Sequence, residues 1–594
     1  MTTCELAATG IDSGALLPLL ALAVLLLWAG VTVVLFRRGG RRRATLLALA
    51  PLLCLGLVAT GASTSSPAAA SAVPASDCPV AVAPAPPGAA PAAAHPTPPS
   101  AEPTPEPTPD PTPEPSPPAV EYTPGAAGIG DPYFPLDGNG GYTVDNYALD
   151  LAYDPTTDEL AGTATITAEA TQNLSSFNFD FDGLTTESIT VDDETATWST
   201  ATTQISAVTG QPLEAGSADP VASPPRTELT VVPARGIDAD NTFTVVVAYR
   251  GIPITVNDVF GAVSGVIHTD DGMLVVGQPR VAATWFPAND HPSDKATFEF
   301  RISVPEGLEV VANGRLVGDT VEDGRSIWEW VADAPMATYL ATASVGEFTL
   351  NTDTQDGITH ITAIDPDLYT LLIPTPEPAG LSYGQVAADS FAAEPGVIEF
   401  LATQFGPYPF DDAGGIADDV TTLQFALENQ TRPIYPLWAF ENPADPRVVV
   451  HELAHQWYGD SVTLERWSDI WLNEGFATYA EWLWDESTTG VTPQQQFDVY
   501  YALDPADPLW ATTVGDPGAA GIFDGSVYVR GAMTLQALRT QVGDDVFFDI
   551  LQGWASANEG GNVTTAEFIA YATEVSGQNL DALFTTWLST AAKP

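Results

Sequence analysis

The segment His451-Glu-Leu-Ala-His455 has the residue types and the spacing of a metal-binding helix. Histidines four positions apart lie on one face of an α-helix, one turn apart, so both imidazoles can bind the same ion. Glu452 lies about 100° around that helix, near enough to act as a general base without being a ligand. The pattern predicts a divalent metal site with His451 and His455 as ligands.

A third ligand is expected from the segment Asp469-Ile-Trp-Leu-Asn-Glu-Gly475. Zinc in hydrolases commonly has three protein ligands and one open position. Glu474 lies on a second predicted helix whose apolar residues allow packing against the first, so its carboxylate can complete a His2Glu site. The three cysteines, Cys4, Cys54 and Cys78, lie far upstream, which excludes a thiolate site. We therefore expect one catalytic Zn²⁺ per chain.

The elements that position these side chains are predicted to be helices. Helical periodicity after about Gly357 is found in the segments 385–405, 445–458, 468–486, 526–541 and 564–575. Asp445-Pro446 is expected to begin the histidine helix, with Asp445 as the cap and Pro446 in the first turn, and Gly459 to end it. Ser468 is expected to cap the helix that carries Glu474.

The half of the folded region that precedes these helices is predicted to be β-rich. From Tyr142 to about Asn351 apolar and polar residues alternate with period two, as in 147–153, 163–168 and 242–249, between turn residues. The sequence therefore predicts an α+β protein. An N-terminal antiparallel β domain (130–351) is followed by a mostly α-helical catalytic domain (357–594).

The first sixty-two residues are predicted to direct the chain to a membrane. Residues 14–36 and 44–62 are apolar, and five arginines lie between them. In one interpretation both segments span the bilayer as a hairpin, and the positive-inside rule places the rest of the chain outside the cell. In the other, the arginines and the second segment form a signal peptide that is cleaved. Both interpretations export the remainder of the chain.

The next segment, 63–124, is rich in Pro, Ala, Ser and Thr and is predicted to be a disordered linker. The whole chain has 76 Asp and Glu against 19 Lys and Arg, a formal net charge of −57. Because a phosphate backbone requires clustered basic residues, nucleic acid is not an expected partner.

Four motifs together resemble those of the M1 (gluzincin) family of zinc aminopeptidases, the aminopeptidase N group. The first is the His-Glu-x-x-His segment, followed after eighteen residues by Glu474 within Trp-Leu-Asn-Glu-Gly-Phe-Ala. The others are Phe425-Ala-Leu-Glu-Asn429, similar to Gly-x-Met-Glu-Asn, then Gly277-Gln-Pro with the segment 284–295, and Tyr528-Val-Arg-Gly-Ala532. The resemblance covers about residues 130–590. It implies a saddle-like β domain and a thermolysin-like catalytic domain.

The resemblance also implies roles for individual residues. Glu428 and Gln278 would bind the free α-amino group of a peptide, with Ala426 and Asn429 of the same motif beside the substrate, and Tyr528 would stabilise the oxyanion. A carboxylate that pairs with an N-terminal ammonium sets the register, so that only the first peptide bond reaches the metal. The expected substrates are peptides with a free N-terminus.

The sequence departs from the family pattern at three places. Phe425 and Leu427 replace the usual Gly and Met, a change expected to reshape the pocket for the first side chain. The chain ends at Pro594, without the family's C-terminal helical-repeat domain, and a more open site that accepts longer peptides is expected. Arg530 stands where the family often has Lys.

Two other functions remain open at this point. One is a zinc endopeptidase that uses the same metal site, and the other is a non-catalytic cell-surface binding protein on a peptidase scaffold. Glu452 and Tyr528 argue against the second, since binding alone needs neither a base nor a phenol. His291 and Lys295 are interpreted as structural residues between the two domains.

Overall fold

The computed structural model describes residues 120–594, except residues 223, 258–261 and 375–379. The two predicted membrane segments and most of the predicted linker lie outside these described residues. Within them, no helix has both the length and the apolar character needed to cross a lipid bilayer. Thr123–Pro124, at the end of the predicted linker, form the short strand β1, which pairs with β4.

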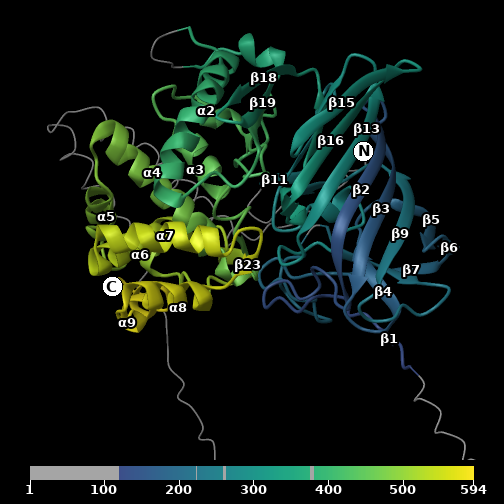
Figure 1. Ribbon diagram of the computed structural model, residues 1–594, viewed down its shortest axis with the longest axis horizontal. Coiled ribbons are helices and arrows are strands. Elements are labelled where there is room, and N and C mark those ends of the chain that lie inside the picture. Colours follow the sequence, from purple (N-terminus) through teal and green to yellow (C-terminus); the bar gives the residue numbers. More distant parts are fainter. Residues whose placement is uncertain (1–119, 223, 258–261, 375–379) are drawn as a thin grey trace, which may run out of the picture. The chain divides into compact units, whose positions relative to one another are not determined.

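The largest sheet has eight strands and belongs to the β-rich part (Figure 1). Its strands follow the order β15 (Arg315–Glu322), β16 (Arg325–Met336), β13 (Ala296–Pro305), β2 (Tyr142–Asp154), β3 (Glu159–Ala170), β9 (Thr242–Gly251), β5 (Thr185–Val191) and β6 (Glu194–Thr195). Neighbouring strands are antiparallel except β2 and β13, which are parallel. Alternate residues of β2 and β3 are buried, as the period of two predicts.

Two smaller sheets complete the β-rich part. One has the order β1, β4 (Leu174–Asp180), β8 (Arg226–Val232) and β7 (Thr197–Thr203). The other has the order β10 (Thr255–Asn257), β11 (Val263–His268), β12 (Met273–Val276), β17 (Ala343–Gly346) and β14 (Glu309–Ala312). Gly277-Gln278 follows β12 directly, so this sheet determines where Gln278 lies.

The helical part begins with a third small sheet, in the order β18 (Thr349–Gln355), β19 (Ile358–Ile364), β20 (Asp412–Ala417) and β21 (Ile434–Tyr435). Its helices are α2 (Tyr383–Phe405), α3 (Arg447–His455), α4 (Trp471–Thr489), α5 (Pro493–Tyr501), α6 (Gly525–Val542), α7 (Asp544–Ala557), α8 (Thr565–Ser576) and α9 (Asp581–Leu588). Strands β22 (Thr463–Leu464) and β23 (Asn562–Val563) pair in parallel. The arrangement confirms the predicted α+β class, with a β-rich part followed by a helical part (Figure 1).

The predicted helices are present, but both predicted caps are wrong. Helix α3 begins at Arg447 with Pro446 at its N-cap and no side-chain cap, because Asp445 instead forms an ion pair with Arg447 at 2.6 Å. Ser468 lies inside a 3₁₀ turn, Trp467–Asp469, and α4 begins after it at Trp471.

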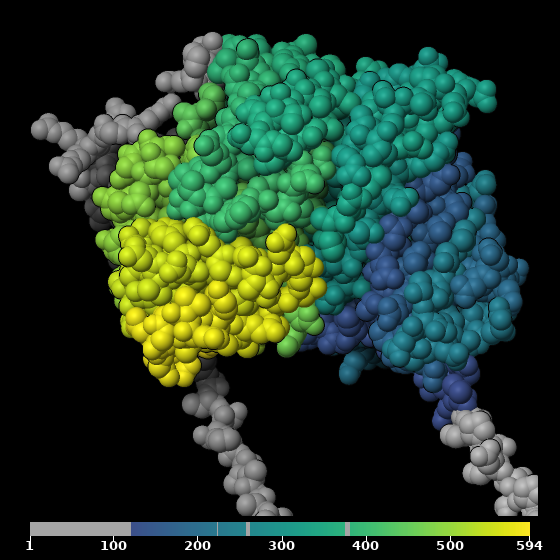
Figure 2. All heavy atoms as spheres, viewed as in Figure 1, coloured from purple at the N-terminus to yellow at the C-terminus, as the bar shows by residue number. Residues whose placement is uncertain are grey.

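One hydrophobic core runs through both parts of the described chain and includes fully buried tryptophans such as Trp285, Trp330 and Trp471. Figure 2 shows residues of the two parts in direct contact on the face in view, teal against green. The contact is polar as well as apolar. The Nζ of the half-buried Lys295 donates to the carbonyl oxygens of Asp460 and Ser461 at 2.8 and 2.9 Å, just after α3.

Candidate active site

Helices α3, α4 and α6 together position the predicted metal ligands. Helix α4 crosses α6 closely at Gly475 and Gly531, where a Cβ on Gly475 would lie 2.9 Å from the Gly531 backbone. Only glycine permits this approach. Glu474 precedes one of these glycines and Tyr528 lies one turn before the other, so the crossing brings both side chains to the face of α3 that carries the histidines.

The three predicted ligands converge. The Oε2 of Glu474 lies 3.2 Å from the Nε2 of His451 and 3.5 Å from the Nε2 of His455. One ligand atom from each residue lies within 4.8 Å of the others, as binding to one ion requires. All three side chains are buried. The structure therefore agrees with the spacing argument for His451, His455 and Glu474.

The other nitrogen of each imidazole already has a partner. The Nδ1 of His451 lies 2.8 Å from Oε1 of Glu481, and the Nδ1 of His455 lies 3.0 Å from the carbonyl oxygen of Tyr458. Both partners are acceptors, so each Nδ1 donates its hydrogen, and each Nε2 can offer its lone pair to a metal that displaces its proton. Histidine ligands of metals usually have such a partner, which fixes the ring and its tautomer.

The charges of the site favour a cation at its centre. Burial opposes a charged imidazole, but Glu428 and Glu474 outweigh it and raise the pKa of His455 to about 9. Burial also opposes ionisation of Glu474, yet His455 and His451 lower its pKa to about 2. One carboxylate and two imidazoles, which bind a metal in their neutral form, make up the donor set that Zn²⁺ prefers in hydrolases. The residues therefore fit zinc.

Glu452 lies beside the metal ligands without being one of the three. Its carboxylate lies within 4.8 Å of a ring nitrogen of His455 and a carboxylate oxygen of Glu428. Burial is the largest influence and raises the pKa of Glu452 to about 8. A carboxylate with a pKa near neutrality can both accept and return a proton, as a general base must.

Tyr528 lies on the first turns of α6, half-buried, with its ring stacked on that of His451 at a centroid distance of 6.0 Å. Burial, with the charges of Glu474 and Glu428, holds the pKa of Tyr528 well above its usual value. The phenol therefore stays protonated at neutral pH and can donate a hydrogen bond to a developing oxyanion.

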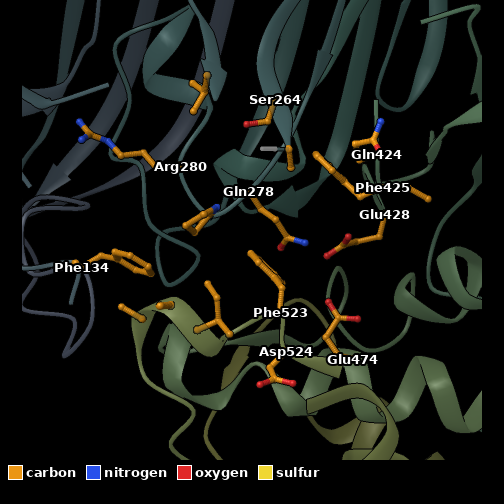
Figure 3. A pocket seen from close by; sticks show the side chains of 18 of the residues that line it. Phe134, Ser264, Gln278, Arg280, Gln424, Phe425, Glu428, Glu474, Phe523 and Asp524 are labelled. Atoms are coloured by element: carbon orange, nitrogen blue, oxygen red, sulfur yellow. The ribbon is translucent and has the colours of Figure 1, made fainter. Parts of the chain in front are cut away.

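Glu428 and Gln278 face one another across the cavity from the helical and the β-rich part (Figure 3). Glu428 is 2 % exposed, and its Oε1 accepts a hydrogen bond from the hydroxyl of Tyr339 at 3.0 Å. Among the described residues no ion pair neutralises its charge. The Oε1 of Gln278 is buried and has no hydrogen-bond partner. Two acceptors that face the same space are suited to an ammonium group.

The remaining residues of the Phe425–Asn429 motif have different positions. Phe425 and Ala426 line the cavity, whereas Leu427 is buried in the core and Asn429 is not among the lining residues. The Nδ2 of Asn429 donates to the carbonyl oxygen of Leu340 at 3.0 Å, which places Asn429 behind Glu428 as a positioning residue. Of the two departures from the family motif, Phe425 alone faces the cavity.

A cavity of about 670 Å³ is lined by the three metal ligands and by Glu452, Tyr528, Glu428, Gln278, Phe425 and Ala426. Its lining combines both parts of the chain (Figure 3): Phe134, Ser264, Gln278 and Arg280 come from the β-rich part, and Phe425, Glu428, His451, Glu474, Phe523 and Tyr528 from the helical part. A cavity of this size accommodates a few amino-acid residues.

Side chains that the sequence does not identify connect the parts of the site. Gln456, directly after the second histidine, accepts from the amide of Thr431 at 2.8 Å and donates to the carbonyl oxygen of Glu428 at 3.2 Å. These bonds tie the metal helix to the irregular segment that carries Glu428. Glu481 and Tyr339 are likewise absent from the predictions. Glu481 lies seven residues after Glu474, two turns along the same helix face, and this spacing is a signal that identifies it.

The predicted structural residues have structural contacts. His291 lies 3.3 Å from a carboxylate oxygen of Asp131, which also accepts from the amide of Trp467 at 3.1 Å. Arg530 is buried and donates to three backbone carbonyl groups, those of Thr512, Thr586 and Thr590. Arg530 therefore anchors the end of α9 and does not face the ligands.

Two family models match the chain. Residues 143–340 match the Peptidase M1 N-terminal domain, and residues 441–587 match the Peptidase family M1 domain. Together they cover more than half of the sequence and include Gln278, the three metal ligands and Tyr528.

Full-length relatives are similar over about half of this chain. Aminopeptidase N of Streptomyces lividans is 27% identical over 325 residues, which are 52% of this chain and 36% of that protein. Aminopeptidase M1 of Arabidopsis thaliana is 28% identical over 350 residues, 53% of this chain and 36% of that protein. The chain thus spans little more than a third of the length of these relatives.

Solved structures are similar over nearly their whole length. The M1 zinc metallopeptidase of Deinococcus radiodurans, as a mutant bound to a Tyr-Ser-Ala substrate, has 26% identity and a TM-score of 0.64, covering 78% of this chain and 97% of that one. A two-domain M1 zinc metallopeptidase mutant bound to L-arginine has 26% identity and a TM-score of 0.65, covering 79% of this chain and 98% of that one.

Proposed function

The chain belongs to peptidase family M1, and from this premise we propose that it is a zinc aminopeptidase that hydrolyses the first peptide bond of peptides with a free N-terminus. The observation that carries the proposal is the position of Glu428. A buried carboxylate without an ionic partner costs free energy unless a cation joins it. The ammonium of a peptide N-terminus is such a cation, and the metal ligands lie in the same cavity.

The short distance between Glu428 and the metal ligands selects the peptide bond that is cleaved. When the ammonium binds between Glu428 and Gln278, only one residue fits between it and the metal ligands, because Glu428 lies within 4.8 Å of His455. Holding the substrate by this end places the first peptide bond at the site of reaction and excludes internal bonds.

Two further side chains act on the reacting atoms. Zn²⁺, when bound, supplies a Lewis acid that polarises the peptide carbonyl and activates water. Glu452 accepts a proton from the attacking water and delivers it to the leaving amine. Tyr528 donates its hydroxyl hydrogen to the oxygen that becomes negative.

The experiment that tests this proposal is a panel of aminoacyl fluorogenic substrates and short peptides, each with a free and with an N-acetylated terminus. We expect hydrolysis of the free forms only, its loss with a zinc chelator and its return with added Zn²⁺. Equal cleavage of acetylated peptides would instead identify an endopeptidase. Binding of peptides without hydrolysis would identify a non-catalytic binding protein.

We also propose that the chain is exported and tethered to a membrane. The support is the pair of apolar segments, 14–36 and 44–62, with arginines between them, followed by the Pro-rich segment. Fractionation of cells that produce the full chain, followed by protease treatment of intact cells, tests the proposal. We expect the protein in the membrane fraction and accessible from outside. A soluble protein with residues 1–62 intact would contradict it.

A further inference from the structure

A second carboxylate cluster lies away from the zinc ligands, where two parallel strands end. Asp365 follows β19 directly, and Asp418 and Asp419 follow β20. Because the strands pair in register, Ile364 with Ala417, the residues after them are neighbours. The amide of Asp365 donates to the carbonyl oxygen of Ala417 at 2.9 Å. The topology therefore brings three aspartates to one edge of the sheet.

The spacing of their oxygens fits a hard divalent cation. One carboxylate oxygen from each of Asp365, Asp418 and Asp419 lies within 4.8 Å of the others. Ca²⁺ binds oxygen ligands at about 2.3–2.6 Å, so oxygens on opposite sides of the ion are about 5 Å apart. A spacing below 4.8 Å suits either ion, but Mg²⁺ demands a near-ideal octahedron whereas Ca²⁺ accepts the irregular geometry of three carboxylates.

Asp418 supplies an observation independent of the clustering. Its side chain is only 5 % exposed, and its Oδ1 is buried without a hydrogen-bond partner. No described Lys, Arg or His forms an ion pair with any of the three aspartates. Burial and the charges of Asp365 and Asp419 raise the pKa of Asp418 to about 8. The backbone amide of Val420 donates to the Asp418 carboxylate, but its buried Oδ1 has no donor, and with two more carboxylates nearby the group requires a cation or a proton.

A further aspartate connects this cluster to the β-rich part. Asp271 lies in the turn between β11 and β12, and its charge acts on Asp365, Asp418 and Asp419. Its own oxygens accept from the Thr269 hydroxyl at 2.8 Å and the Glu347 amide at 2.6 Å. Asp271 is therefore held outside the group of three and adds negative charge to it.

We propose that Asp365, Asp418 and Asp419 form a calcium site that is separate from the catalytic zinc. The remaining ligands of Ca²⁺ would be water and backbone carbonyl groups, as is usual for sites with few protein ligands. The site joins the ends of β19 and β20. The chain leaves β20 through Asp418 and Asp419 and reaches Phe425 and Glu428 a few residues later, so calcium would stabilise the start of the segment that binds substrate.

The test compares the zinc-loaded full chain in calcium-free buffer with the same protein at millimolar Ca²⁺, by calorimetric titration and thermal unfolding. We expect one Ca²⁺ per chain and an unfolding temperature raised by several degrees, through preferential binding to the folded state. The variants are Asp418→Asn and, as the matched control, Asp389→Asn. Both remove one negative charge, but Asp389 lies exposed on α2.

The sign of the effect separates a calcium ligand from a structural residue. Without calcium, Asp418→Asn should unfold at a higher temperature than the wild type, because it relieves repulsion among the carboxylates. With calcium, the wild type should gain several degrees and Asp418→Asn should gain little. Destabilisation of Asp418→Asn under both conditions, or calcium stabilisation equal in both variants, would overturn the proposal. An equal shift with Mg²⁺ would overturn the assignment to calcium.

This inference does not rest on the proposed peptidase function, since neither readout measures hydrolysis. A protein that binds calcium but hydrolyses no peptide would retain the calcium site and lose the aminopeptidase assignment. A protein that hydrolyses peptides but binds no calcium would support the aminopeptidase assignment and overturn the calcium site.

Discussion

Glu474 and Asp418 are both buried carboxylates next to other charged groups, yet their surroundings have opposite effects. Two imidazoles lie against Glu474 and lower its pKa to about 2. Two carboxylates lie near Asp418, and with burial they raise its pKa to about 8. Burial alone therefore does not determine the charge of an acidic side chain. The neighbours that the fold brings to it decide whether it is an anion, an acid or a cation ligand.

The largest expected effect in this comparison comes from Glu452, the carboxylate that lies beside the zinc ligands without being one. Glu452→Gln should lower kcat by about 10²–10⁴-fold, because the amide cannot accept the proton of water. Zinc content, measured by elemental analysis, should stay at one per chain. The control is Glu399→Gln on the exposed side of α2. Full activity of Glu452→Gln would contradict the assigned role.

Removal of the partner of His451 should have the next largest effect. Glu481→Gln keeps the shape of the side chain but weakens the bond to Nδ1, now 2.8 Å long. Zinc affinity should fall by about 10- to 100-fold, as for other residues that orient metal ligands. Competition with a fluorescent zinc chelator measures this change. At saturating zinc, kcat should recover most of its value, which would not occur if Glu481 acted on the substrate.

Glu428→Gln tests whether the ammonium group of the substrate is the cation that pairs with the Glu428 carboxylate. We expect kcat/KM for free N-terminal peptides to fall by about 10- to 100-fold, since a charge-assisted hydrogen bond contributes about 1.5–3 kcal/mol. Most of the change should appear in KM. The same variant should bind zinc normally. An unchanged KM would show that the ammonium binds elsewhere.

Glu394 is a third kind of buried carboxylate, fully buried on α2 with both oxygens unpartnered. Burial raises its pKa to about 8 in the folded protein, above the value of 4.5 for a free group. The wild type therefore loses stability as pH rises from about 4.5 to 8. Glu394→Gln should lack this loss, so it should match the wild type near pH 4.5 and exceed it at pH 9. Urea unfolding at both pH values measures the difference.

How much could be predicted from the sequence depended on how far apart the cooperating residues lie in the chain. His451, Glu452 and His455 lie within one helical turn, so their spacing alone indicates the metal site. Glu474 required two helices to pack, which their apolar faces made predictable. Asp365 and Asp418 are more than fifty residues apart and meet only through the register of two parallel strands, which the sequence does not reveal.

The resemblance to the M1 family identified residues whose contacts it could not describe. Glu428 was expected in the substrate site, but its partner Tyr339 follows from the packing of the β-rich part. Asn429 was grouped with the substrate-binding residues, and its side chain is directed to the Leu340 carbonyl group. The two predicted caps failed for different local reasons: Asp445 pairs with Arg447 instead of the helix N-terminus, and Ser468 lies inside a 3₁₀ turn that precedes α4.

The substrate cavity lies between two parts of the chain that each bury their own share of the core. Gln278 and Glu428, the two proposed ligands of the ammonium group, come from opposite sides, and Lys295 helps to hold the sides together. Neither half contains a complete binding site. Because the binding site is complete only where the two parts meet, a small shift at this junction is expected to reduce turnover before circular dichroism registers any loss of helix or strand.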